Sequence, residues 1–97
     1  MNYLQISLQA IPNQNIVVTL NSQKCAIYLN EMNGRQYITV KSNGVVMCSN
    51  ILIQTGMPLV NAGYLGFSGE MIVVDTVSNE PPSYSGWNSR WILMYAY

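Results

Sequence analysis

Hydrophobic and polar residues alternate along most of this chain, which is typical of β-strands that bury one face. Near the start, the alternation covers residues 4–8, stops at Pro12 and resumes as a β-branched run at residues 16–20. Two more runs, residues 70–76 and 90–97, follow a glycine-punctuated stretch. The pattern therefore predicts short strands, with at most one short helix or helical turn, because no 3.6-residue period persists for more than a turn.

Two Asn-Gly pairs in the middle of the chain predict tight hairpins. Asn33-Gly34 and Asn43-Gly44 each lie between alternating runs. Asn-Gly is the preferred pair for a type I′ turn, which needs positive φ at both central residues. The spacing of the two pairs predicts a three-stranded meander with strands at about 24–31, 36–42 and 45–53.

The register of this meander follows from two-residue turns. It pairs Leu29 with Ile38, Ile27 with Val40, and Val40 with Met47. A one-residue slip would mix the polar and apolar faces, so the separation of the two faces supports this register. The predicted inward face consists of Ile27, Leu29, Ile38, Val40 and Met47.

The two cysteines of the chain, Cys25 and Cys48, fall on the outer strands of the predicted meander. In this register they point to opposite faces and lie at least about 9–10 Å apart. A disulfide needs Cα atoms within about 7 Å. We therefore expect two free thiols.

The length of 97 residues fits one hydrophobic core, and we expect one domain over residues 1–97. The predicted fold class is all-β: a small antiparallel β-sandwich or barrel with a central three-stranded meander.

Charge is scarce in this sequence and changes the expected partners. The formal net charge is zero, and charged residues make up 8% of the chain. A surface of this kind does not attract phosphates, so we expect no nucleic-acid recognition. We also expect no membrane insertion, since the start of the chain lacks the pattern of a signal peptide and the longest apolar run is far too short to span a bilayer. These features predict a protein made in the cytoplasm that works surrounded by other proteins.

Residues for catalysis or metal binding are few. The chain has no histidine, so the commonest general base and metal ligand is missing. Glu70 and Asp75 are offset by five positions on a predicted strand and should face opposite sides. We therefore expect no enzyme activity, no catalytic residue, no cofactor and no metal site.

Aromatic residues gather near the end of the sequence. They could form a stacking platform for sugars or bases, or they could belong to the core or to a protein interface, where tyrosine, tryptophan and arginine are enriched. We favour the core or a protein interface, since no basic lining accompanies the rings. The candidate interface residues are Tyr84, Trp87, Arg90, Trp91, Tyr95 and Tyr97.

The last strand, residues 91–97, is apolar on both faces and carries neither charge nor proline. Such a segment is either a central strand or an edge strand completed by another subunit. We expect the second arrangement, and hence a homo-oligomer that self-associates when isolated.

Four segments of the sequence resemble a known family: residues 3–14 (YLQISLQAIPNQ), 64–69 (YLGFSG), 74–76 (VDT) and 84–91 (YSGWNSRW). The family is that of the baseplate plug proteins of contractile-tailed phages, first defined in a cyanophage and widespread in prophages. The resemblance implies an all-β structural component of the tail baseplate in the virion, without enzymatic activity. It also implies packing against the baseplate hub and the tail-tube or sheath-initiator proteins. The alternative is a stand-alone small β-barrel that binds a saccharide or a peptide.

Overall fold

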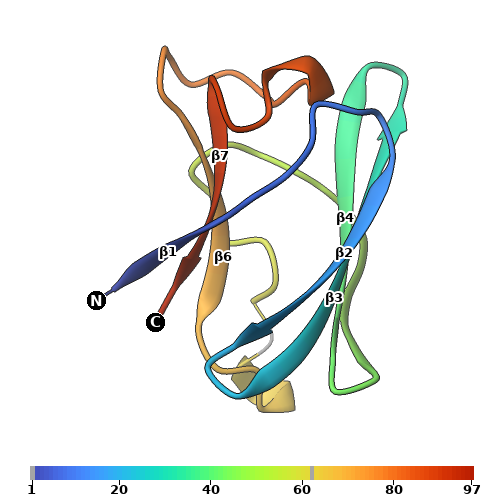
Figure 1. The fold of residues 1–97 in the computed structure, drawn as a ribbon, viewed down its shortest axis with the longest axis vertical. Coiled ribbons are helices and arrows are strands. Elements are labelled where there is room, and N and C mark those ends of the chain that lie inside the picture. Colours follow the sequence, from blue (N-terminus) through green and yellow to red (C-terminus); the bar gives the residue numbers. More distant parts are fainter. Residues whose placement is uncertain (1, 62) are drawn as a thin grey trace.

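The computed structural model describes residues 2–61 and 63–97, and this part of the chain is built almost entirely from antiparallel strands (Figure 1). The strands are β1 (Tyr3–Ile6), β2 (Gln14–Leu20), β3 (Gln23–Met32), β4 (Arg35–Ser42), β5 (Val45–Leu52), β6 (Glu70–Asp75) and β7 (Trp91–Ala96). The strand order is β2-β3-β4-β5 in one sheet and β1-β7-β6 in the other. The all-β prediction is confirmed, and within the described residues the two sheets form a sandwich rather than a closed barrel.

The predicted meander is confirmed as β3, β4 and β5. Both Asn-Gly turns have positive φ at both residues, 52° and 77° in the first turn and 52° and 84° in the second. Between β3 and β4 the register is as predicted, with Ile27 opposite Val40 and Leu29 opposite Ile38. The alternation of apolar side chains and the turn chemistry together fix this hairpin.

The predicted register between β4 and β5 is wrong beyond the turn. Val40 lies opposite Cys48 and not Met47, because the ladder shifts on both sides of Val40. Each shift adds a residue to β5, which is the effect of a β-bulge. Met47 is only partly buried, whereas the inward residues predicted on β3 and β4 are fully buried.

The bulges also change the position of the cysteines. Cys25 lies opposite Ser42, and Cys48 lies opposite Val40. Residues opposite each other in an antiparallel pair share a face, so both thiols belong to the inward face, and the predicted opposite facing is wrong. Both cysteines are nevertheless free, as expected.

A third hairpin, between β2 and β3, has a turn that the sequence did not reveal. Asn21 and Ser22 form its two-residue loop, with φ values of 50° and 65°, and Leu20 lies opposite Gln23. Serine seldom adopts positive φ, so Asn-Ser is a much weaker turn signal than Asn-Gly.

The expected position of the last strand is wrong. β7 is the central strand of its sheet, with β1 on one side and β6 on the other. Its inward side chains, Trp91, Leu93 and Tyr95, are buried. The sequence could not show this, because β1, which covers one edge of β7, comes from the opposite end of the described chain.

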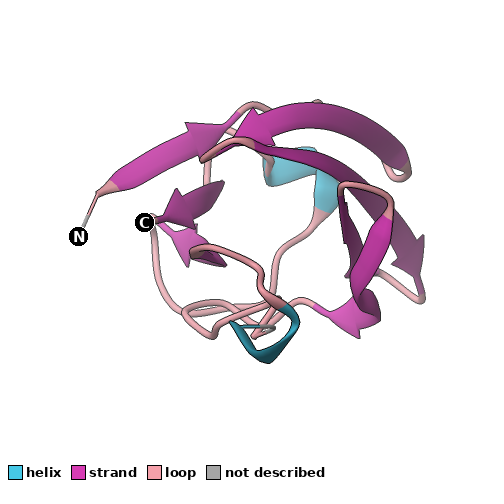
Figure 2. Cartoon of the chain, turned by 90° about the horizontal axis from the view of Figure 1, so that it is seen from below, coloured by secondary structure: helices cyan, strands magenta, loops and turns pink. Residues whose placement is uncertain are grey.

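The core lies between the two sheets and includes Ile6, Leu20, Ile27, Leu29, Ile38, Val40, Met71, Val73, Leu93 and Tyr95. Figure 2 shows the strands arranged around this interior. One side is closed by loops, which include the 3-10 turn η1 (Gly63–Leu65). A second turn, η2 (Tyr84–Gly86), follows Pro82. The expectation of at most one helical turn is therefore wrong, since 3-10 turns of three residues leave no periodic pattern in a sequence.

Candidate functional site

The outer face of the β1-β7-β6 sheet is the most unusual surface of the described residues. Side chains alternate along a strand, so the buried Met71 and Val73 point inward while Ile72 and Val74 point outward. On β7, Ile92 and Met94 point outward by the same rule. The outer face is therefore apolar where an ordinary sandwich presents polar side chains to water.

The strand pairing places these outward side chains in rows. Val74 lies opposite Ile92, and Ile72 lies opposite Met94, which lies opposite Gln5 on β1. Val74 is 38% exposed, and Ile72, Ile92 and Met94 are partly exposed. Strands that are apolar on both sides normally belong to sheets covered on both faces. The uncovered outer face of this sheet is therefore a candidate surface for contact with another protein.

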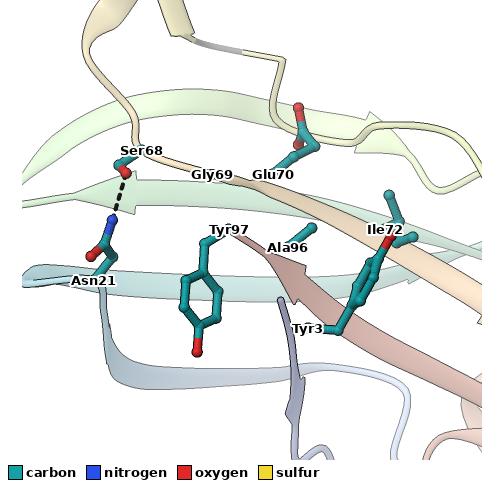
Figure 3. Close-up of a pocket in the computed structure, with 8 residues that line it drawn as sticks. All are labelled: Tyr3, Asn21, Ser68, Gly69, Glu70, Ile72, Ala96 and Tyr97. Atoms are coloured by element: carbon teal, nitrogen blue, oxygen red, sulfur yellow. Dashed lines mark hydrogen bonds between the residues drawn. The ribbon is translucent and has the colours of Figure 1, made fainter. Parts of the chain in front are cut away.

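A groove of about 530 Å³ adjoins this face where β7 ends (Figure 3). Its lining is mainly apolar and aromatic, with Tyr3 and Ile72 on one side and Tyr97 on the other. Tyr3 and Tyr97 are 54% and 51% exposed, so both rings are available for contact. We call Tyr3, Ile72, Val74, Ile92 and Met94 the outer apolar face. Tyr97, whose ring stacks on the inward Tyr95, borders this face at the groove.

Glu70 is the one charged residue in the groove lining, and its carboxylate is occupied by hydrogen bonds from the backbone. Its carboxylate accepts bonds from the N–H groups of Val60, Asn61 and Met71, each at 2.8 Å. In Figure 3 the carboxylate points away from Tyr97. Glu70 therefore anchors the loop before η1, and the groove itself suits an uncharged partner.

A buried polar cluster fixes one end of the groove. Gln23 Oε1 accepts the N–H of Ser68 at 2.9 Å, and Gln23 Nε2 donates to the Ser68 carbonyl at 3.0 Å. The Tyr95 hydroxyl also donates to the Ser68 carbonyl, and burial raises the pKa of this phenol. The Tyr97 ring stacks on Tyr95 with centroids 5.4 Å apart, so the cluster orients an exposed ring from beneath.

The structure divides the interface residues suggested by the sequence into two groups. Trp87, Trp91 and Tyr95 are buried in the core, at 3%, 7% and 1% exposure. Tyr84 packs partly against the core, and only Tyr97 is as exposed as the contact surface requires. The cluster that these residues form in the sequence is therefore not a single surface cluster in the fold.

Arg90, the sixth of these residues, forms ion pairs within the chain. Its Nε lies 2.9 Å from Asp75 Oδ1, and its Nη2 lies 2.7 Å from Glu80 Oε2. The guanidinium also covers the Trp91 ring, 4.4 Å from the centroid. The Asp75 bonds hold the pKa of that carboxyl well below its usual range, and raise the pKa of Arg90. The cluster connects the β6 end to β7 and is a structural clamp.

The two thiols and the carboxylates are the other side chains relevant to nucleophilic or metal chemistry. Burial raises the pKa of both thiols, Cys25 and Cys48, which makes them poor nucleophiles. No group of three or more cysteine and carboxylate side chains in residues 2–61 and 63–97 lies close enough to hold a metal ion. No helix in this part of the chain has the length and apolar character to cross a membrane.

Sequence reasoning missed the outer apolar face, namely Tyr3, Ile72, Val74, Ile92 and Met94. A signal was present: Ile72, Val73 and Val74 are consecutive, and residues 91–97 are all apolar. Unbroken apolar runs indicate strands covered on both faces. The sequence could not show that these two strands lie side by side with one face uncovered.

Comparison with protein-family models identifies a family for the chain. Residues 1–97, the whole chain, match a protein-family model described as "Cyanophage baseplate Pam3 plug gp18". No curated protein matches the chain.

Proposed function

Because the chain belongs to the cyanophage baseplate plug family, we propose that it packs as a plug against the central hub and the tail-tube or sheath-initiator proteins of a contractile tail. The family match over residues 1–97 carries this proposal. Family membership supports a structural role in the baseplate of a bacteriophage or prophage, located in the tail of the virion.

The outer apolar face supports packing against other proteins. Interfaces that persist in an assembly resemble a core cut in half, with aromatic residues and methionine enriched and charge depleted. Tyr3, Ile72 and Met94 give this face that composition, and Tyr97 adds an exposed ring at the adjoining groove. Among the residues suggested by the sequence, we propose that Tyr97 makes direct contacts, while Trp87, Trp91 and Tyr95 support the surface from the core.

We further propose that residues 1–97 act as one domain without enzymatic activity. Both sheets contribute to one hydrophobic core, and the radius of gyration of 12.3 Å is typical of a single domain of this length. Self-association of the isolated protein would follow from the same outer apolar face, in the form of a homo-oligomer.

Co-purification tests the proposal. The protein is expressed together with the hub, tube and sheath-initiator proteins encoded beside it, and one component is captured by an affinity tag. We expect the wild-type chain to co-purify with at least one of them. Met94→Lys should prevent this, because it would bury a charge without a partner in the interface.

Val77→Lys is the matched control. Val77 is 72% exposed and lies beyond β6, outside the outer apolar face. It should co-purify like the wild type, and both variants should keep the wild-type circular dichroism spectrum. If the wild-type protein is a monomer that binds a glycan and does not bind any of the baseplate proteins, the proposal is contradicted and the stand-alone binding module is favoured.

A further inference from the structure

The sandwich has four sheet edges, and two of them are protected. The β6 edge is covered by the preceding loop: the N–H groups of Gly56 and Leu59 donate to the carbonyls of Val73 and Met71, at 2.8 and 2.9 Å. The β5 edge is interrupted by its two register shifts. Covering loops and bulges are the usual means by which proteins prevent unwanted strand pairing.

The other two edges, β1 and β2, have neither protection. Both strands pair with their neighbours in continuous register, and neither contains a charged residue or a proline. Figure 1 shows them diverging from the loop that joins them. Residues of both strands line one groove, so the two unprotected edges border the same opening.

The free backbone groups of β1 follow from its pairing with β7. Asn2 and Tyr97 exchange both backbone hydrogen bonds, at 2.7 and 2.9 Å. Bonded and non-bonded pairs alternate along an antiparallel ladder, so Leu4 and Ile6 also bond to β7. The backbone N–H and C=O groups of Tyr3 and Gln5 consequently point away from β7, toward the opening.

The same argument applies to β2. The two-residue turn makes Leu20 and Gln23 a bonded pair, so Val18 and Ile16 also bond to β3. The backbone groups of Asn15, Val17 and Thr19 therefore point away from β3. Each wall of the opening thus presents a row of donors and acceptors.

A groove of about 440 Å³ lies between these walls, and we call it the β1–β2 seam. Ile6, Ile16 and Val18 contribute apolar side chains that also pack in or against the core. The seam has no ionisable side chain, and its lining consists of Leu4, Gln5, Ile6, Ser7, Ile16, Val17 and Val18.

We infer that the β1–β2 seam binds an extended, uncharged segment of another protein by strand addition, with alternate apolar side chains on the seam floor. Backbone groups on both walls match a segment whose two edges are both free. An edge strand from a second folded copy has one side occupied by its own sheet, so it satisfies only one wall. The absence of charge in the seam favours a neutral segment. This inference concerns a different surface from the outer apolar face and does not depend on the baseplate assignment.

Amide hydrogen exchange with a model peptide tests the inference. The probe is an acetylated and amidated heptapeptide of alternating threonine and valine, added to the isotope-labelled full chain at up to about 1 mM. We expect exchange at Tyr3, Gln5, Val17 and Thr19 to slow by about tenfold or more. A peptide with the same side chains but with every amide N-methylated should give no protection, because it has no N–H donor for either wall.

Val17→Pro provides a second, independent control. It removes one free N–H from the β2 wall without removing a β2–β3 hydrogen bond, and proline is tolerated at sheet edges. This variant should bind the peptide at least about tenfold more weakly, whereas Val17→Thr should bind like the wild type.

Three results would overturn the inference. The first is no protection of seam amides at the highest peptide concentration. The second is equal protection by the N-methylated peptide, which would mean that the contact is only hydrophobic. The third is protection of the same amides that rises with protein concentration in the absence of peptide, which would assign the seam to a second copy of this chain.

Discussion

Gly69 is the position where a single side-chain atom would disturb the candidate site most. Its φ is +91°, and a Cβ there would lie 2.5 Å from Tyr95 Oη and 2.7 Å from the Ala96 carbonyl oxygen. Both atoms belong to the part of β7 that borders the groove. The backbone and the phenol thus pack together only because residue 69 has no side chain.

We predict that Gly69→Ala destabilises the protein through both strain and collision. Gly66→Ala is the matched control, because Gly66 has a φ of +86° with no atom within 4 Å of an added Cβ. The control should lose about 1–2 kcal/mol of unfolding free energy from backbone strain alone. Gly69→Ala should lose roughly 1–3 kcal/mol more, measured by chemical denaturation. Equal losses would mean that Tyr95 moves aside without cost.

A second residue-scale prediction concerns acid stability. Arg90 lowers the folded-state pKa of Asp75, so this carboxyl stabilises the fold above its unfolded pKa of about 4, and the contribution is lost as the pH falls further. Asp75→Asn should lower the melting temperature at pH 7 and should reduce the additional loss between pH 4 and pH 2. Glu31→Gln, outside the Arg90 ion pairs, serves as control. A parallel pH profile of Asp75→Asn and wild type would contradict this.

Element-scale structure was predicted best where turn chemistry is specific. Asn33-Gly34 and Asn43-Gly44 fix two hairpins from the sequence alone, whereas the alternation of apolar residues did not indicate the register shifts of β5 on both sides of Val40. The partners of β7 were also out of reach, because strand order depends on contacts between segments far apart in the chain. Local rules thus predict hairpins, and long-range packing decides which strand becomes central.

The Asn21-Ser22 turn gives a prediction at this scale. Ser22 has a φ of 65° and is exposed. Ser22→Gly should remove the strain and stabilise the protein by about 0.5–1 kcal/mol, after the greater chain entropy of glycine is subtracted. Gly34→Ser, at the same position of the next hairpin, should destabilise it by a similar amount. Denaturant midpoints measure both changes, and a destabilised Ser22→Gly would show that the serine side chain has a role of its own.

The candidate site could be predicted only in part because it is a property of the whole molecule. Aromatic residues near the end of the sequence indicated an interface, but composition does not say which rings face inward, and Trp87, Trp91 and Tyr95 do. The outer apolar face exists only after β1, β6 and β7 have come together. The sequence shows several of its residues as parts of apolar runs, but it does not show that they are exposed together on one face.

The pairing of β1 with β7 also bears on how the molecule folds. Leu8 and Asn88, which are hydrogen-bonded near this pair, are 80 residues apart in the chain. Closing so long a loop is entropically costly, whereas each hairpin of the β2-β3-β4-β5 sheet closes over two residues. We therefore predict that pulse-labelled refolding protects the amides of β3 and β4 before those that bond between β1 and β7. Simultaneous protection would contradict this order.

Until β1 arrives, β7 is an uncharged strand with an open edge, and the newly made chain is then most vulnerable to aggregation.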